Sequence, residues 1–238
     1  MRHPSAATVG EAVSFPYSRA RAPRLGLEPG VAAGYFIPPM PRADEFQQVT
    51  DGLYFWQAYD PAVKVDLSCC ARRTARGLVF IDPLPLARPA LAELCEVAAP
   101  AAIILTNSNH ARAAADYRTR FSIPILAHAA AVAELGLAVD REIADGETVL
   151  DEFTIIALPG AAPGEIALHA RGVLHVGDAL IHLAPHGFAL LPEKYCADAK
   201  EMRVSLGKLL RFPFEVLTFA HGLPLVSQAR QRLAELLA

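Results

Sequence analysis

The chain has 238 residues, of which 53% are hydrophobic and 20% are charged, so it is long enough to bury one sizeable core. Its formal net charge of −3 provides no overall positive field that would hold nucleic acid or an anionic membrane surface, and neither partner is expected. The N-terminal residues lack an apolar signal segment, and no stretch approaches the roughly 18 apolar residues of a membrane span, which favours a cytoplasmic protein.

The four cysteines do not form a recognisable metal or redox motif. No two of them have the CxxC spacing of a zinc-finger pair. We therefore expect reduced thiols in or near a core. The four residues are Cys69, Cys70, Cys95 and Cys196.

Residues 1–44 are rich in proline and glycine. Seven of the nineteen prolines precede Arg42, which argues against a regular helix or a central strand there. The sequence therefore predicts an irregular extension over 1–44 and one domain over 45–238. The extension also carries large apolar side chains such as Phe15 and Phe36, which are costly to leave in water. We expect part of it to pack on the domain or on a second copy of the chain, as in a homodimer.

The first part of the domain alternates short apolar runs with helical patterns. Turn residues bound each run, which is typical of strands that alternate with helices. The predicted strands cover 53–56, 63–72, 78–81, 102–105 and 123–127, and the predicted helices cover 88–98, 109–121 and 129–135.

The second part favours antiparallel strands joined by short glycine-containing turns. Pro185 and Gly187 argue against a helix over 178–187, so Asp178, His182 and His186 are expected in a loop rather than on one helical face. His128, His169 and His175 fall in or at the end of strand runs and are expected to be structural. The predicted strands lie at 149, 153–158, 166–169, 173–176 and 215–219, and the helices at 197–210 and 225–237.

Six short segments occur in a fixed order along the domain and together resemble the metallo-β-lactamase superfamily. Each is weak alone, but six in order over residues 46–238 are a specific signal. The resemblance implies an α/β (α+β) fold, a four-layer αββα sandwich, and a superfamily composed mostly of hydrolases of thioesters, lactams, lactones and phosphodiesters. The segments are TDGLYFW at 50–56, GLVFIDP at 77–83, IILT at 103–106, LPGAAPGE at 158–165, HVGD at 175–178 and FAHG at 219–222.

The metal-binding motif of this family, HxHxDH, is largely absent from the corresponding stretch NSNHAR at 107–112. When the register is anchored on Thr106, five of the seven ligand positions of the family are changed. Only Asp178 and His221 match the ligands that the resemblance implies. The changed positions are Asn107, Asn109, Ala111, Arg112 and, after Pro-Gly, Ala161.

These changes predict that no metal is bound. A catalytic zinc ion keeps three protein ligands, and two retained ligands do not complete that set. A guanidinium 4 Å from a dication would repel it by roughly 8 kcal/mol at an effective dielectric near 20. We therefore expect Arg112 to replace the metal structurally, with its nitrogens about 2.7–3.2 Å from the Asp178 carboxylate.

The candidate catalytic residues are His110, Asp178 and His221. His110 lies between two former ligand positions, so its ring either takes part in the site or serves in helix N-terminal packing. Cys196 has no sequence neighbour that would lower its pKa, so a nucleophilic role is not expected. The residues predicted to line the cleft are Asn107, Asn109, Arg112, His182, Tyr195 and Cys196.

Two functions fit these observations. The favoured one is a metal-free pseudo-enzyme or small-molecule binding protein that keeps the cleft of the superfamily. The alternative is an active hydrolase of esters, thioesters or lactones, with zinc or another divalent metal held by Asp178, His221 and a third donor such as His110 or His182. Metal analysis of the purified protein separates the two.

Overall fold

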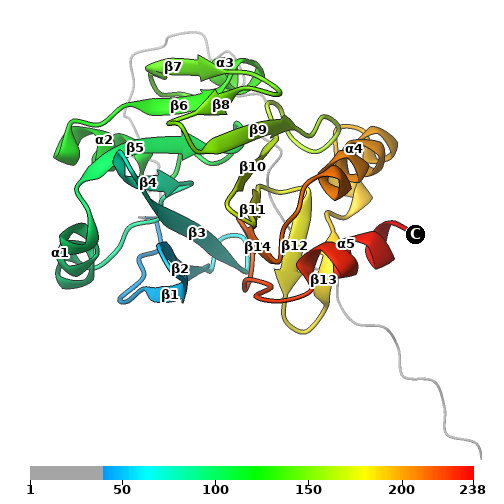
Figure 1. Cartoon of the computed structure of the whole chain (residues 1–238), viewed down its shortest axis with the longest axis horizontal. Coiled ribbons are helices and arrows are strands. Elements are labelled where there is room, and N and C mark those ends of the chain that lie inside the picture. Colours follow the sequence, from blue (N-terminus) through cyan, green and yellow to red (C-terminus); the bar gives the residue numbers. More distant parts are fainter. Residues whose placement is uncertain (1–39) are drawn as a thin grey trace, which may run out of the picture.

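The computed structural model describes residues 40–238. The extension predicted over 1–44 lies almost entirely outside this range. Two sheets pack face to face and helices cover the outer face of each, as Figure 1 shows. The expected four-layer αββα sandwich is thereby confirmed. None of the helices in residues 40–238 combines the length and the apolar character needed to cross a membrane.

One inner layer is a seven-stranded mixed sheet in the order β1-β2-β3-β4-β5-β6-β7. Neighbours are antiparallel from β1 to β4 and parallel from β4 to β7. The central strands are continuous apolar runs because both of their faces are covered. The strands are β1 (Gln47–Thr50), β2 (Leu53–Asp60), β3 (Val65–Thr74), β4 (Gly77–Ile81), β5 (Pro100–Leu105), β6 (Ile125–His128) and β7 (Arg141–Ile143).

The second inner layer is a five-stranded sheet in the order β14-β11-β10-β9-β8. Strands β8 to β11 pair antiparallel, as the short glycine turns predict, and β14 joins β11 in parallel. The strands are β8 (Thr148–Val149), β9 (Phe153–Ala157), β10 (Ile166–Ala170), β11 (Val173–Val176) and β14 (Val216–Phe219).

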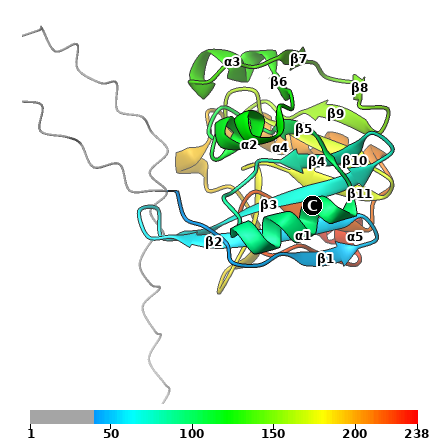
Figure 2. The ribbon, with the colours of Figure 1, turned by 90° about the vertical axis from the view of Figure 1, so that its left-hand side faces the viewer.

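Helices α1, α2 and α3 cover the seven-stranded sheet, and α4 and α5 cover the other sheet (Figures 1 and 2). Three apolar layers result: one beneath α1–α3 around Phe80, one between the sheets around Ile155, and one beneath α4 and α5 around Leu217. The helices are α1 (Arg88–Val97), α2 (Ala114–Phe121), α3 (Ala129–Leu135), α4 (Ala199–Leu206) and α5 (Ala229–Leu237), with short 3₁₀ turns η1 (Glu193–Tyr195) and η2 (Gly207–Arg211).

Three local predictions are wrong. The last helix, expected from residue 225, begins only at Ala229. The helix expected from residue 109 begins only at Ala114, because Asn107 Oδ1 accepts the Asn109 N–H at 2.8 Å and this local turn competes with the helix. The loop expected over 178–187 contains a hairpin instead, formed by β12 (Leu180–Leu183) and β13 (Gly187–Leu190). Pro185 and Gly187 exclude a helix there, as predicted, but Pro185 lies in the turn of a hairpin and Gly187 begins its second strand.

The segments that resemble the family meet at one edge of the sandwich. Strands β5, β11 and β14 end at Leu105, Val176 and Phe219, and β9 ends one residue before Leu158. Backbone hydrogen bonds then join the segments that follow: Ile166 N–H donates to Thr106 O at 2.8 Å, and Ala220 N–H donates to Val176 O at 3.1 Å. The loops that follow these strands are therefore held close together.

Candidate functional site

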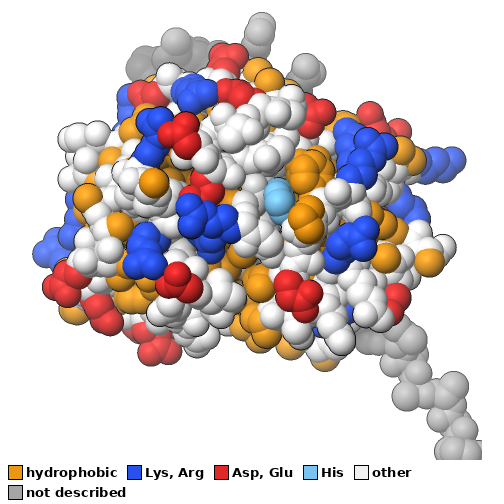
Figure 3. Space-filling model, in the orientation of Figure 1, with side chains coloured by type: hydrophobic (Ala, Val, Ile, Leu, Met, Phe, Trp, Pro, Cys, Tyr) orange, Lys and Arg blue, Asp and Glu red, His pale blue; other side chains and the backbone are white. Residues whose placement is uncertain are grey.

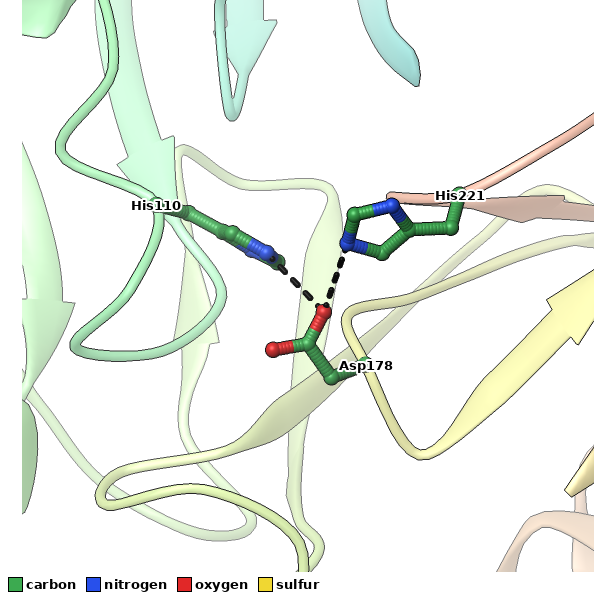
Figure 4. Close-up of side chains that lie close together, drawn as sticks. All are labelled: His110, Asp178 and His221. Carbon is green, nitrogen blue, oxygen red and sulfur yellow. Dashed lines mark hydrogen bonds and ion pairs between the residues drawn. The ribbon is translucent and has the colours of Figure 1, made fainter. Parts of the chain in front are cut away.

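Three potential metal donors converge at this edge, one from each of three loops. His110 follows β5, Asp178 follows β11 and His221 follows β14, and all three side chains are buried. The Nε2 atoms of His110 and His221 each lie 3.1 Å from Asp178 Oδ1 (Figure 4). The three ligand atoms lie within 4.8 Å of one another.

A buried carboxylate orients His110. Asp82 Oδ2 lies 3.0 Å from His110 Nδ1, opposite the nitrogen that faces Asp178. Asp82 in turn accepts hydrogen bonds from the N–H and the hydroxyl of Thr106, at 2.8 and 2.5 Å. Metal-binding histidines usually donate their second ring N–H to a carboxylate in this way. Asp82 also has a φ of 50°, a strained conformation of the kind that concentrates at functional sites.

The three donors fit a single metal ion. A tetrahedral ion with bonds of about 2.0–2.2 Å separates its donor atoms by about 3.3–3.6 Å. The two 3.1 Å separations at Asp178 Oδ1 need only a small expansion to reach that range. Two imidazoles and one carboxylate are also a ligand set found in catalytic zinc sites.

Within residues 40–238, no second group of histidine, cysteine and carboxylate donors of this kind is found. The Asn107 amide donates to Glu165 Oε2 at 2.6 Å and to Asp178 Oδ2 at 3.0 Å. The Asn109 amide donates to the same Asp178 oxygen at 3.3 Å. Both amides therefore present N–H groups to carboxylates, and the Asn107 oxygen accepts the Asn109 N–H. Ala161 is buried and offers no donor atom.

Burial and the charges inside the site shift the pKa values of its titratable groups. Burial and the nearby Arg112 guanidinium lower the pKa of His110, but the carboxylates of Asp178 and Asp82 outweigh them and raise it to about 9. Burial opposes ionisation of Asp178, yet the charge and hydrogen bond of His110 hold its pKa well below the usual range. Burial and then the Asp178 charge raise the pKa of Glu165 to about 8. His110 can therefore act as a cation between two carboxylates.

Arg112 does not contact Asp178, so the structural replacement expected for it is wrong. Its Nη1 donates to Ser68 O at 2.6 Å and to Asp82 O at 3.2 Å, and its Nη2 donates to Ala220 O at 3.1 Å. The reason is that Asp178 already receives hydrogen bonds from two imidazoles and two amides, whereas the guanidinium satisfies carbonyl groups of β3 and of the residues directly after β4 and β14.

The other predicted cleft residues lie outside the three-donor group. His182 lies on β12, where its Nδ1 contacts Leu223 O at 2.7 Å. Tyr195 lies in η1. Burial raises the pKa of the Cys196 thiol, and Glu193 raises it further, so this cysteine is not an activated nucleophile.

The histidines expected to be structural do make structural hydrogen bonds. His169 Nε2 contacts Pro213 O at 2.8 Å, and His175 Nδ1 contacts Thr218 Oγ1 at 2.8 Å. The His128 side chain accepts the Ala130 N–H at the start of α3.

Sequence reasoning did not select Asp82 or Glu165, both of which are buried beside the candidate ligands. A signal existed for Asp82, because a carboxylate directly after a fully apolar strand faces the edge where other strands also end. Glu165 follows the Pro-Gly turn of a family segment, and its proximity to Asn107 depends on the path of two separate loops.

The loop that carries His221 depends on Gly222. This glycine has a φ of +96°, and a Cβ atom there would lie 1.9 Å from His182 O. We expect Gly222→Ala to lower the free energy of unfolding by about 3 kcal/mol or more, because it adds a backbone clash to the strain of a positive φ. Gly187 is the matched control, since its φ is +76° but nothing lies within 4 Å of its Cβ position. Gly187→Ala should cost only about 1–2 kcal/mol. Equal costs in urea unfolding would show that the approach to His182 is not tight.

Comparisons with known proteins agree with this architecture. The model of the metallo-β-lactamase superfamily matches residues 48–238. No protein in the search of curated proteins matches the chain. Among solved structures, the DIM-1 metallo-β-lactamase aligns with a TM-score of 0.65 at 13% identity, covering 84% of this chain and 97% of that one. An Erythrobacter litoralis metallo-β-lactamase aligns at 0.63 with 14% identity, covering 81% and 95%. A metallo-β-lactamase family protein from Thermus thermophilus aligns at 0.57 with 20% identity, covering 79% of each chain.

The fold and the polar loop edge define an αββα protein with the architecture of the metallo-hydrolases. The family match extends over most of the chain, and the chain belongs to the metallo-β-lactamase superfamily. At 20% identity or less, the likeness to these three structures concerns the fold alone.

Proposed function

We propose that this protein is a hydrolase that works with one divalent metal ion, zinc by preference, bound by His110, Asp178 and His221. The observation that carries the proposal is the convergence of these three donors within 4.8 Å, with Asp82 behind His110. His110 thus supplies the third ligand that the changed HxHxDH motif lacks. The substrates belong to the ester, thioester or lactone class that the superfamily hydrolyses.

The residues of the chain have separate roles in this proposal. A divalent ion at the three donors would lower the pKa of a bound water and polarise a carbonyl group. Asp82 keeps the Nε2 of His110 directed at Asp178. The amides of Asn107 and Asn109 bind Asp178 Oδ2 and leave Oδ1 to face the two histidines. Asn109 is only partly buried, so the amide hydrogen that does not bind Asp178 would be available to the carbonyl oxygen of a substrate.

One observation favours a metal-free binding protein as the second candidate. A protonated His110 between Asp82 and Asp178 balances part of the buried negative charge by itself. A buried carboxylate that is paired with a cation and hydrogen-bonded does not require a metal. In this case the cleft would bind a small molecule without turnover.

Metal content and hydrolysis, measured together, test the proposal. Protein purified without chelator is expected to contain about one divalent ion per chain, by mass spectrometry of the metals. Hydrolysis of p-nitrophenyl acetate, a thioester and a γ-lactone should disappear after dialysis against a chelator and return with zinc. A protein that stays metal-free in excess zinc would support the second candidate, the metal-free binding protein. Two ions per chain would contradict the conclusion that Asn107 and Asn109 bind carboxylates and not a second metal ion.

We also infer from composition that the protein works in the cytoplasm without nucleic-acid or membrane partners. On the face shown in Figure 3, acidic and basic side chains are interspersed, which supports this inference for that face. Homo-oligomer formation through the N-terminal extension remains a prediction on residues outside the described range.

A further inference from the structure

A second concave site lies on the outer helical layer, between α1 and α2. It is a cavity of about 250 Å³. Its floor is apolar and includes Leu91 of α1 and Tyr117 of α2, both buried. The Tyr117 hydroxyl is turned away to donate to Leu84 O at 3.1 Å, which leaves its ring to the floor. Figure 2 shows α1 and α2 on the same face of the seven-stranded sheet, with α2 above α1.

The rim of this cavity is strongly positive for a chain with a net charge of −3. Arg42, Arg88 and Arg120 all line it, and Asp116 is the one acidic residue in the lining. Within residues 40–238, neither Arg88 nor Arg120 has a hydrogen-bond or ion-pair partner. Arg42 pairs only with the exposed Asp44, at 3.5 Å. Three like charges around one small cavity repel each other, and an anion bound between them would relieve that repulsion.

We propose that this cavity binds a small organic anion, with a carboxylate or phosphate between the guanidinium groups and an apolar portion on the floor. Guanidinium groups bind these oxyanions with two parallel hydrogen bonds, which makes arginine the usual residue for such sites. A volume of about 250 Å³ admits a group the size of a substituted benzene ring. The site is separate from the metal centre and does not depend on the proposed hydrolysis.

The experiment is isothermal titration calorimetry of the full chain with three probes. Phenyl phosphate and benzoate carry the anion on an apolar ring, and benzyl alcohol carries the ring without charge. We expect the two anions to bind and benzyl alcohol not to bind, and the stronger anion identifies the group that the ligand carries. The absence of binding by both anions up to about 10 mM would overturn the proposal.

Variants assign the binding to this cavity. Arg88→Gln and Arg120→Gln should each weaken anion binding about tenfold, because each removes a charge-assisted hydrogen-bond donor. Asp116→Asn should strengthen it two- to threefold, at about the scale of one exposed charge. Arg118→Gln is the matched control, because Arg118 lies on the same helix but pairs with Asp140 at 2.6 Å outside this cavity. Binding that persists in the Arg88 and Arg120 variants but is lost in His221→Ala would place the anion at the metal centre and refute the proposal.

Discussion

The substitution His221→Ala is expected to reduce bound zinc from about one ion to less than about 0.1 ion per chain. It leaves His110 and Asp178, and two protein ligands do not hold a catalytic zinc ion at ordinary concentrations. Hydrolytic activity should fall by at least about a hundredfold for the same reason, since hydroxide no longer forms near neutral pH. Metal content by mass spectrometry and initial rates with the three ester-type substrates measure both effects.

His182→Ala is the matched control for this prediction. His182 lies on the neighbouring strand β12, where its backbone N–H donates to His221 O at 3.0 Å, but its side chain is not one of the three donors. Zinc content should therefore stay near that of the unmodified chain. If His182→Ala loses the metal and His221→Ala keeps it, the metal lies elsewhere and the assignment of the ligands is wrong.

The substitution Arg112→Ala is expected to lower the free energy of unfolding by about 3–5 kcal/mol. The guanidinium donates hydrogen bonds to carbonyl groups of Ser68, Asp82 and Ala220, which belong to β3, the loop after β4 and the loop after β14. Alanine removes these three hydrogen bonds and weakens the connection between the two sheets at the edge that carries the site, although Ala220 O still accepts the Ser68 N–H at 2.8 Å. Urea unfolding followed by circular dichroism measures the change.

Two further variants make this prediction specific to the geometry of Arg112. Arg118→Ala removes an exposed pair with Asp140 and should cost less than about 1 kcal/mol. Arg112→Lys keeps the charge but not the planar fork, so it should recover less than half of the loss. If Arg112→Ala and Arg118→Ala cost the same, the three carbonyl contacts do not hold the sheets together.

The fold could be predicted because the sequence patterns that indicate it are local and occur several times along the chain. Apolar runs such as 78–81 and 102–105 predicted buried strands, and the six ordered segments predicted the sandwich that the structure confirms. Apart from the hairpin missed over 178–187, the errors lie at helix starts, where other hydrogen bonds compete with the helix. Asn107 delays helix α2, and the backbone pairing of Leu217 with Leu225 occupies a residue that the pattern had placed in the last helix.

The candidate site was less predictable because it depends on the directions of side chains in loops. The spacing of residues along the chain does not determine those directions. Counting from Thr106 put His110 between ligand positions and placed Arg112 on a ligand position. In the folded chain the loop turns His110 toward Asp178 and Arg112 toward three carbonyl groups. A residue in an irregular loop has no period that relates its number to its direction, unlike a residue in a helix or a strand.

The sequence by itself determined the superfamily and the order of the strands along the chain, because both follow from residue types along the chain. Asparagine and alanine cannot supply the imidazoles of a second zinc ion, whatever their surroundings. Only the tertiary structure decided which histidine joins Asp178 and His221 and which carboxylate orients it. That choice depends on three loops that meet at one edge of two packed sheets. His110 and Asp178, which two of these loops carry, are 68 residues apart in the chain.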